Sequence, residues 1–391
     1  MEHHVTQICP EDYGTLLSFL NRAFTANPAS RHFETNMPRM CNSPERLSQH
    51  YVIWDQGRIT AAIGIFSYTF SIGNTVLRAA TVGNIAVAPE YRGSGYMQAL
   101  MTYAMQKLTD MQVDLSRLGG LRSRYENYGY EPSGSVFRFL LTPRNGADYL
   151  KKNPGNPYRY DALTSPDASV MQMAEVLYNR NHIRLHRSDF GSFHDSMCMW
   201  KSKPYAVYCP DGCCIGYLCT DETGSTVFEY GHQISACRMA MLADYVVQTG
   251  QEYWITVYPW DLPLCRELHR YAEAYQTSVP SHFKVLHWDV VLQALLTLKR
   301  KLKVLPTGQL CVKIGTYGNV RIVVDADGCW CDTVSSDIPA DLCLHELIAA
   351  QVFFGPGSPA ELISELSDPA QALLLHAWFP LPLSWNQNDN L

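Results

Sequence analysis

The sequence lacks the features that mark membrane proteins and nucleic-acid-binding proteins. Its longest near-continuous apolar stretch, Leu347 to Phe354, is interrupted by Gln351 and is far too short to span a bilayer. There is no Lys/Arg run, and 31 Lys and Arg stand against 37 Asp and Glu, which gives a net charge of −6. This balance argues against binding through nucleic-acid phosphates. The N-terminal residues show no basic segment followed by an apolar one, so we expect no signal peptide and no membrane binding, and predict a cytoplasmic protein.

Paired CxxC spacings are also absent, although the chain has 13 cysteines. An odd number of cysteines in a long chain without an export signal favours free thiols in a reducing compartment. The densest group lies in YCPDGCCIGYLC, and one interpretation of it is a zinc site. Structural zinc usually shows paired ligand knuckles. The pattern therefore favours a strand after a Pro-Asp-Gly turn, and we predict no metal at these four residues: Cys209, Cys213, Cys214 and Cys219.

Another candidate metal pair is His182 and His186, which stand four residues apart and would share one helix face. No carboxylate accompanies them in the manner of HExxH. Solvated histidines at the end of a helix expected over 167–182 are the favoured interpretation.

Length and pattern divide the chain into three segments. At 391 residues and 47% apolar composition, two or three packed domains are expected. Residues 1–150 begin with an amphipathic helix, continue as an antiparallel meander and end with the strand pattern SVFRFLLTP. The polar stretch that follows marks the boundary to residues 151–288, which repeat the αβ pattern. Residues 289–391 combine helices with a three-stranded meander, so the fold class is α/β and α+β.

The most informative stretch is VGNIAVAPEYRGSGYMQALM, which covers 82–101. A β-branched run ends at Val87, Pro89 stops the strand, and an amphipathic helix is expected over 94–109. Unpaired N–H groups at a helix N-terminus attract phosphate oxygens, and Gly93 and Gly95 allow the backbone to approach them closely. The turn therefore indicates a ligand with a diphosphate, and a plain glycine-containing β–α turn is the alternative. Neither GxxxxGK[ST] nor GxGxxG is present, which disfavours nucleotide hydrolysis.

Two motifs carry a resemblance to a known family. VAPEYRGSGYM resembles the acyl-CoA pyrophosphate loop of the GNAT superfamily of N-acetyltransferases, Arg/Gln-x-x-Gly-x-Gly/Ala, although Met97 replaces the last small residue. About thirty residues later, RYENYGYEP is similar to the next element of that family, in which Tyr125 is followed four residues on by Gly129 and an aromatic residue. The resemblance covers residues 1–145.

The layout of the whole chain narrows this resemblance. A GNAT domain, a second αβ domain without the loop, and a third segment containing FFGPGSPAEL resemble the Eis (enhanced intracellular survival) acetyltransferases. This implies tandem GNAT-like domains, each a mixed sheet flanked by helices, followed by a sterol-carrier-protein-like α+β domain. It also implies a homo-oligomer, because Eis-like proteins are commonly hexameric.

The resemblance implies an acetyl-CoA-dependent N-acetyltransferase that acts on a small-molecule amine, such as an aminoglycoside-like polyamine, or on a Lys side chain. Tyr125 would be the general acid, and the terminal carboxylate of Leu391 would be the base. The alternatives are that Tyr125 only packs, that the tail is frayed, and that the protein senses acetyl-CoA or holds an apolar ligand without turnover. The backbone of Ile85, Ala86 and Val87 would bind the acetyl carbonyl and pantetheine, and the pyrophosphate would lie on Arg92, Gly93, Ser94, Gly95, Tyr96, Met97 and Gln98.

Overall fold

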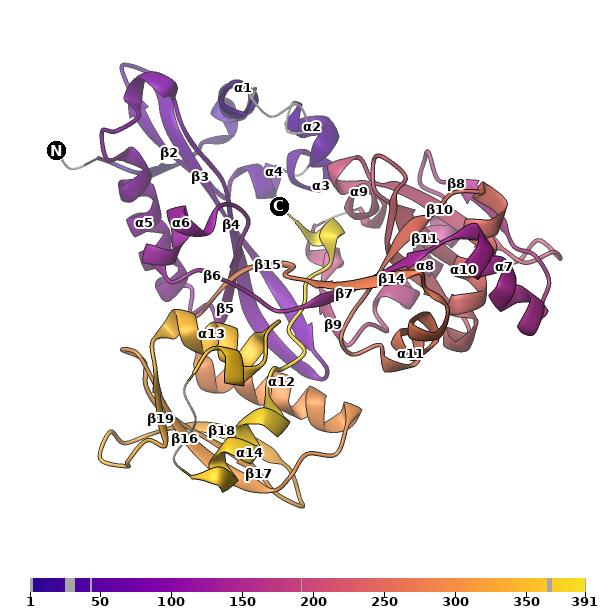
Figure 1. Ribbon diagram of the computed structural model, residues 1–391. Coiled ribbons are helices and arrows are strands. Elements are labelled where there is room, and N and C mark those ends of the chain that lie inside the picture. Colours follow the sequence, from indigo (N-terminus) through magenta and orange to yellow (C-terminus); the bar gives the residue numbers. More distant parts are fainter. Residues whose placement is uncertain (1–2, 25–31, 43, 191, 364–367, 391) are drawn as a thin grey trace. The chain divides into compact units, whose positions relative to one another are not determined.

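Three β-sheets with helices around them organise the computed structural model (Figure 1). The structure describes residues 3–24, 32–42, 44–190, 192–363 and 368–390. The chain divides into two compact units, which are described separately. Unit 1 comprises Met1–Gly134 and Ser281–Leu383, and unit 2 comprises Ser135–Pro280 and Ser384–Asn390.

The first sheet of unit 1 is built around a long antiparallel hairpin of two strands. Ile72 pairs with Thr75 beside the turn, and the two strands run together as far as Ala61 and Val87. The strands in spatial order are β1 (Thr6–Gln7), β2 (His50–Asp55), β3 (Arg58–Ile72), β4 (Thr75–Val87), β5 (Leu115–Leu118), β15 (Ser281–Val285) and β6 (Glu131–Ser133).

Helices cover this sheet with apolar side chains. The predicted helix after the glycine turn is confirmed: it spans Tyr96–Asp110 and buries Leu100, Met101, Ala104 and Leu108 against the strands. The apolar side chains recur at helical spacing, which is why one face of this helix faces the sheet. The helices of this part are α1 (Tyr13–Ala23), α2 (Phe33–Asn36), α3 (Pro38–Cys41), α4 (Pro44–Leu47), α5 (Tyr96–Asp110) and α6 (Arg122–Tyr125).

The C-terminal part of unit 1 is a small α+β structure. The three-stranded meander predicted for it is present, and a fourth strand, Leu342–Leu344, adds to it in parallel just before the helix that begins at Glu346. The spatial order of strands is β18 (Cys329–Val334), β17 (Gly318–Val324), β16 (Gly308–Ile314) and β19 (Leu342–Leu344), and the helices are α12 (Trp288–Leu302), α13 (Glu346–Phe354) and α14 (Pro369–Trp378).

Unit 2 has a sheet of its own. Aromatic and aliphatic side chains from both the strands and the helices fill its core. In spatial order its strands are β14 (Ala274–Ser278), β7 (Val136–Leu141), β13 (Tyr253–Val257), β12 (Thr226–His232), β11 (Cys214–Thr220), β10 (Lys203–Tyr208) and β8 (Arg159–Ala162). Its remaining elements are α7 (Pro143–Lys152), α8 (Ala168–Tyr178), β9 (Ile183–Leu185), α9 (Phe193–Met197), α10 (Arg238–Thr249) and α11 (Leu262–Tyr271).

Two strands lie on the other side of the segment boundaries that the sequence suggests. Strand β7, expected to close the first sheet, pairs with β13 and β14 in the sheet of unit 2. Strand β15, expected in the second segment, pairs with β5 and β6 in unit 1. The chain therefore exchanges one strand between the sheets at each boundary.

Two local features differ from what the sequence pattern indicates. The polar stretch after β7, which the pattern marks as a segment boundary, begins with the helix α7, because Thr142 caps it in a capping box with Asn145 and Pro143 occupies its first turn. His182 and His186 do not share a helix face, because α8 ends at Tyr178 and β9 lies between the two histidines. Among the described residues, no helix combines the length and the apolar character needed to cross a membrane.

Candidate active site

Strand β4 presents a free backbone edge at its C-terminal end. It pairs with β5 in parallel only from Ala79 to Val82, opposite Leu115 to Leu118. The remaining residues of β4 keep their antiparallel partner β3 on one side, where Ala86 pairs with Ala62. Within the described residues no strand pairs with the other side of that segment. The N–H and C=O groups of Ile85 to Val87 that face this side can therefore bond an extended, amide-bearing ligand.

A bulge marks the place where this edge opens. The β3–β4 register shifts between Ala62 and Gly64, and Asn84 adopts a positive φ of 52°, which is uncommon for a residue other than glycine. The Asn84 side-chain amide lies 3.2 Å from Nε2 of the fully buried His50. The other ring nitrogen of His50 lies 3.0 Å from the Leu47 carbonyl oxygen, which makes Nδ1 the donor and Nε2 the acceptor. This arrangement requires a neutral imidazole.

The buried His50 makes stability depend on pH. Burial lowers its pKa to about 4 from 6.5, so the unfolded chain binds a proton first as the pH falls. Stability that is present above pH 6.5 is lost as the pH falls towards 4, by up to about 3 kcal/mol. Urea unfolding between pH 7 and pH 4 measures this loss. We expect a His50→Gln variant to have the shallower pH slope, and equal slopes would contradict the assignment.

The loop between β4 and α5 supplies unpaired amide groups. Gly93 and Gly95 both have φ of +81°, and Gly95 is the N-cap of α5 without any side-chain cap. The first-turn N–H groups of α5, those of Tyr96, Met97 and Gln98, have no intrahelical acceptor. They lie at the positive end of the helix dipole, which suits them to bind phosphate oxygens.

Replacing Gly95 by valine should weaken acetyl-CoA binding at least about tenfold, because a β-branched residue is strained at this φ and its side chain would project from the phosphate-facing turn. An added Cβ meets nothing closer than His3 Nε2 at 3.8 Å, so the fold should survive. Gly73→Val is the matched control, since Gly73 has φ of +59°, equally open space and a place in the distant β3–β4 turn. Calorimetry that finds undiminished binding in a folded Gly95→Val protein would refute the pyrophosphate assignment.

One cavity of unit 1, of about 570 Å³, joins the free edge, the loop and Tyr125. Its walls include nine of the predicted site residues, while Ser94 and Gln98 do not line it. Four wall residues were not predicted from the sequence: Ala23, Phe24, Tyr91 and the exposed Arg124, which adds a second cation to the cavity that Arg92 lines. The predicted residues in the wall are Ile85, Ala86, Val87, Arg92, Gly93, Gly95, Tyr96, Met97 and the acid candidate Tyr125.

Tyr125 is fixed at the end of the short helix α6. Its side chain is largely buried, and burial raises the pKa of the phenol above 10, so it stays protonated at neutral pH. The helix is tied down by Arg122, whose Nε lies 2.9 Å from Oε1 of the buried Glu131. Gly129 then turns with φ of +82°, and the Tyr130 hydroxyl lies 2.7 Å from Ser116 Oγ. These bonds hold the predicted Tyr-Gly-Tyr element in one position.

Gly120 leaves the space that the Tyr125 ring occupies. A Cβ on Gly120 would lie 2.6 Å from Tyr125 Cε2, at a φ of +148° that favours glycine. Gly120→Ala should therefore displace the ring and lower kcat, by up to about 10²-fold, with little change in acetyl-CoA affinity. Gly119→Ala is the control, because its added Cβ would meet only Arg117 at 3.4 Å. Equal kcat values for the two variants would contradict this account.

The predicted base, Leu391, lies outside the described residues, but the tail before it is described. Asp389 is buried in unit 2, where its Oδ1 accepts a bond of 2.9 Å from Arg187 Nε and its Oδ2 accepts one of 2.8 Å from the Tyr178 hydroxyl. Arg187 also donates two bonds, of 2.8 and 2.6 Å, to Glu229, which accepts a further bond from Asn388. The Trp200 indole N–H also donates to the Asn390 carbonyl oxygen at 3.3 Å, so the described end of the tail is bonded within unit 2.

Comparison with known proteins finds a family model that matches the part of the chain containing this site. Residues 4–133 match the family model described as an acetyltransferase (GNAT) domain. A search of curated proteins finds no match. Three solved structures are similar over nearly the whole chain. They are a probable N-acyltransferase from Enterococcus faecalis V583 (16% identity, TM-score 0.64, 98% of each chain), a GCN5-related N-acetyltransferase from Kribbella flavida (16%, 0.65, 97% of this chain and 98% of that one), and Eis1 from Mycobacterium abscessus (13%, 0.64, 99% and 100%).

At these identities the structural likeness is one of fold, and it confirms the predicted fold class of mixed sheets flanked by helices. The match to the acetyltransferase (GNAT) domain model is confined to residues 4–133, and the fold is similar to that of Eis1 over nearly the whole chain. The sterol-carrier-like character of the last segment stays a prediction.

Proposed function

We propose that the protein is an acetyl-CoA-dependent N-acetyltransferase in which an amine attacks the thioester directly. The observation that carries this proposal is the cavity in which the free edge of β4, the left-handed glycine loop and Tyr125 come together. GNAT domains use acetyl-CoA, and each part of this cavity suits one part of that molecule. The free edge suits the acetyl carbonyl and the pantetheine amides, and the loop suits the pyrophosphate.

Tyr125 is the general acid in this proposal. The amine nitrogen bonds to the acetyl carbon, the carbon–sulfur bond breaks, and the departing thiolate takes the phenol proton. A phenol with a pKa above 10 holds its proton at neutral pH until a thiolate forms nearby. The products are the acetylated amine and free coenzyme A.

The carboxylate of Leu391 is the base in this proposal, as the resemblance to Eis implies. It takes the proton that the attacking amine loses and then releases it to solvent, while Tyr125 regains a proton from solvent, so that no net proton is gained or lost in a turnover. An α-carboxyl is ionised at neutral pH and can accept a proton directly or through water.

The acceptor in this proposal is a small-molecule amine, an aminoglycoside-like polyamine or a Lys side chain, and the oligomer is a hexamer as in Eis-like proteins. Light scattering tests the oligomer. A thiol-release assay with acetyl-CoA and a panel of aminoglycosides, polyamines and Lys peptides tests the function. We expect thiol release that depends on at least one amine. Tight acetyl-CoA binding without thiol release for any amine would favour the alternative, a protein that senses acetyl-CoA or holds an apolar ligand.

A further inference from the structure

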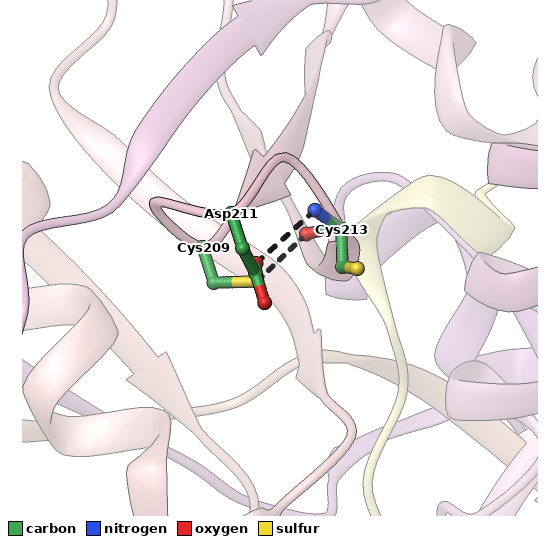
Figure 2. Close-up of side chains that lie close together, drawn as sticks. All are labelled: Cys209, Asp211 and Cys213. Carbon is green, nitrogen blue, oxygen red and sulfur yellow. Dashed lines mark hydrogen bonds between the residues drawn. The ribbon is translucent and has the colours of Figure 1, made fainter.

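A cluster of thiol and carboxylate groups lies on the hairpin between β10 and β11, outside the acetyltransferase cavity. Cys209, Asp211 and Cys213 occupy one pentapeptide, Cys-Pro-Asp-Gly-Cys (Figure 2). Their ligand atoms, two sulfurs and a carboxylate oxygen, all lie within 4.8 Å of one another. Asp211 and Cys213 are exposed, and Cys209 is partly so, which leaves the cluster open to solvent.

The backbone of the turn is already arranged to hold the three side chains together. The Cys209 N–H donates to the Cys213 carbonyl at 3.0 Å, and the Gly212 N–H donates to the Cys209 carbonyl at 3.0 Å. Gly212 has φ of +86°, and Pro210 restricts the first position of the loop. Because the loop is fixed without any ion, little chain entropy has to be lost when an ion binds.

The chemistry of the cluster fits a thiophilic divalent cation. Cys209 Sγ donates a hydrogen bond of 2.6 Å to Asp211 Oδ1. A proton therefore lies between two groups that could both be ligands of one metal ion. Two thiolates and one carboxylate are typical ligands of Zn²⁺, and a Cys-x3-Cys spacing lies within the range of zinc knuckles. Thiolates are soft ligands that discriminate against Mg²⁺ and Ca²⁺.

We propose that this turn, made of Cys209, Asp211 and Cys213, is an accessory site for Zn²⁺ or another thiophilic divalent cation, with water completing the tetrahedron. Each ion displaces the two thiol protons, so binding weakens as the pH falls. The structure holds the ligands on one hairpin of unit 2, independent of the acetyltransferase domain of residues 4–133. Cysteine spacing alone disfavours a metal here, because the chain has no pair of CxxC knuckles; in this proposal Asp211 is the third ligand.

The test is titration of the reduced full-length protein with Co²⁺ and with Cd²⁺, in a phosphine reductant that does not compete for the metal. Absorption shows the thiolate-to-metal charge-transfer band, and native mass spectrometry gives the number of ions bound. A Cys209→Ser/Cys213→Ser double variant should lose one bound ion and its band. Asp211→Asn should weaken binding by at least the roughly 10–100-fold that loss of an outer-shell partner costs.

The matched control is a Cys9→Ser/Cys343→Ser double variant, which removes two exposed thiols elsewhere on the chain. It should retain the ion and the band that the cluster variant loses. Circular dichroism verifies that each variant is folded. The proposal is overturned if the parent shows no charge-transfer band, or if the cluster variant and the control variant bind the same number of ions with equal affinity. Neither result bears on acetyl transfer, which the thiol-release assay tests separately.

Discussion

Tyr125→Phe should lower kcat by about 10²–10⁴-fold, the range that a positioned general acid contributes. The ring and its packing remain, so the fold and the cavity should persist, and only the proton for the departing thiolate is lost. Acetyl-CoA affinity should stay within a few-fold of the parent, because the donor is bound by β4 and the glycine loop. Steady-state kinetics with calorimetry of acetyl-CoA binding separate these two effects.

The control for this experiment is Tyr128→Phe. Tyr128 lies in the neighbouring 3₁₀ turn, Glu126–Tyr128, is partly buried and does not line the cavity. Its variant should keep the kcat of the parent. If Tyr125→Phe also stays within a few-fold of the parent, Tyr125 is a packing residue and the acid lies elsewhere.

Blocking the terminal carboxylate should have an effect of similar size. A protein in which Leu391 ends in a carboxamide, prepared by ligation of a synthetic C-terminal peptide, loses the negative charge and gains no bulk. If that carboxylate is the base, kcat should fall by about 10²–10⁴-fold with acetyl-CoA binding nearly intact. A few residues added after Leu391 should have the same consequence, and so should deletion of the last few residues.

The ligated protein with a free carboxylate is the matched control, since it carries the same junction. It should be as active as the parent. Full activity of the carboxamide form would reject the terminal carboxylate as the base and would transfer that role to an internal Asp, Glu or water chain. The roles proposed for Tyr125 and the glycine loop would stand after that result.

The part of the site that the sequence predicts well is the part that is local in the chain. The strand end, Pro89, the two glycines and the helix of 96–110 are neighbours in sequence, and their geometry follows from backbone preferences that single residues impose. The second family motif identifies Tyr125 as a site residue. It lies only about thirty residues after the glycine loop in the sequence, and it lines the same cavity.

The features that could not be predicted depend on distant parts of the chain. The alternating pattern of β7 fits either sheet, so only the pairing with β13 and β14 shows where it belongs. Asn84, which has a positive φ, lies against His50, 34 residues earlier. The buried bond between Arg187 and Asp389 joins charges that are 202 residues apart. No local pattern in the sequence signals any of these three.

Helix α7 is different, because its signal was present in the sequence. Thr142 and Pro143 form a standard helix start, but the polar composition of the following residues by itself indicates only a segment boundary. At this boundary the capping residues predict the helix, whereas the average polarity of the segment does not.

Direct transfer from acetyl-CoA to an amine is the central claim, and a single-turnover reaction analysed by intact mass tests it most directly. The protein is mixed with acetyl-CoA and the best amine of the panel, and acetylated amine, free coenzyme A and protein mass are measured over time. We predict one acetylated amine for each coenzyme A released and no acetyl group on the protein at any time. Coenzyme A release through an acetylated protein, or release as free acetate without acetylated amine, would contradict the proposed mechanism.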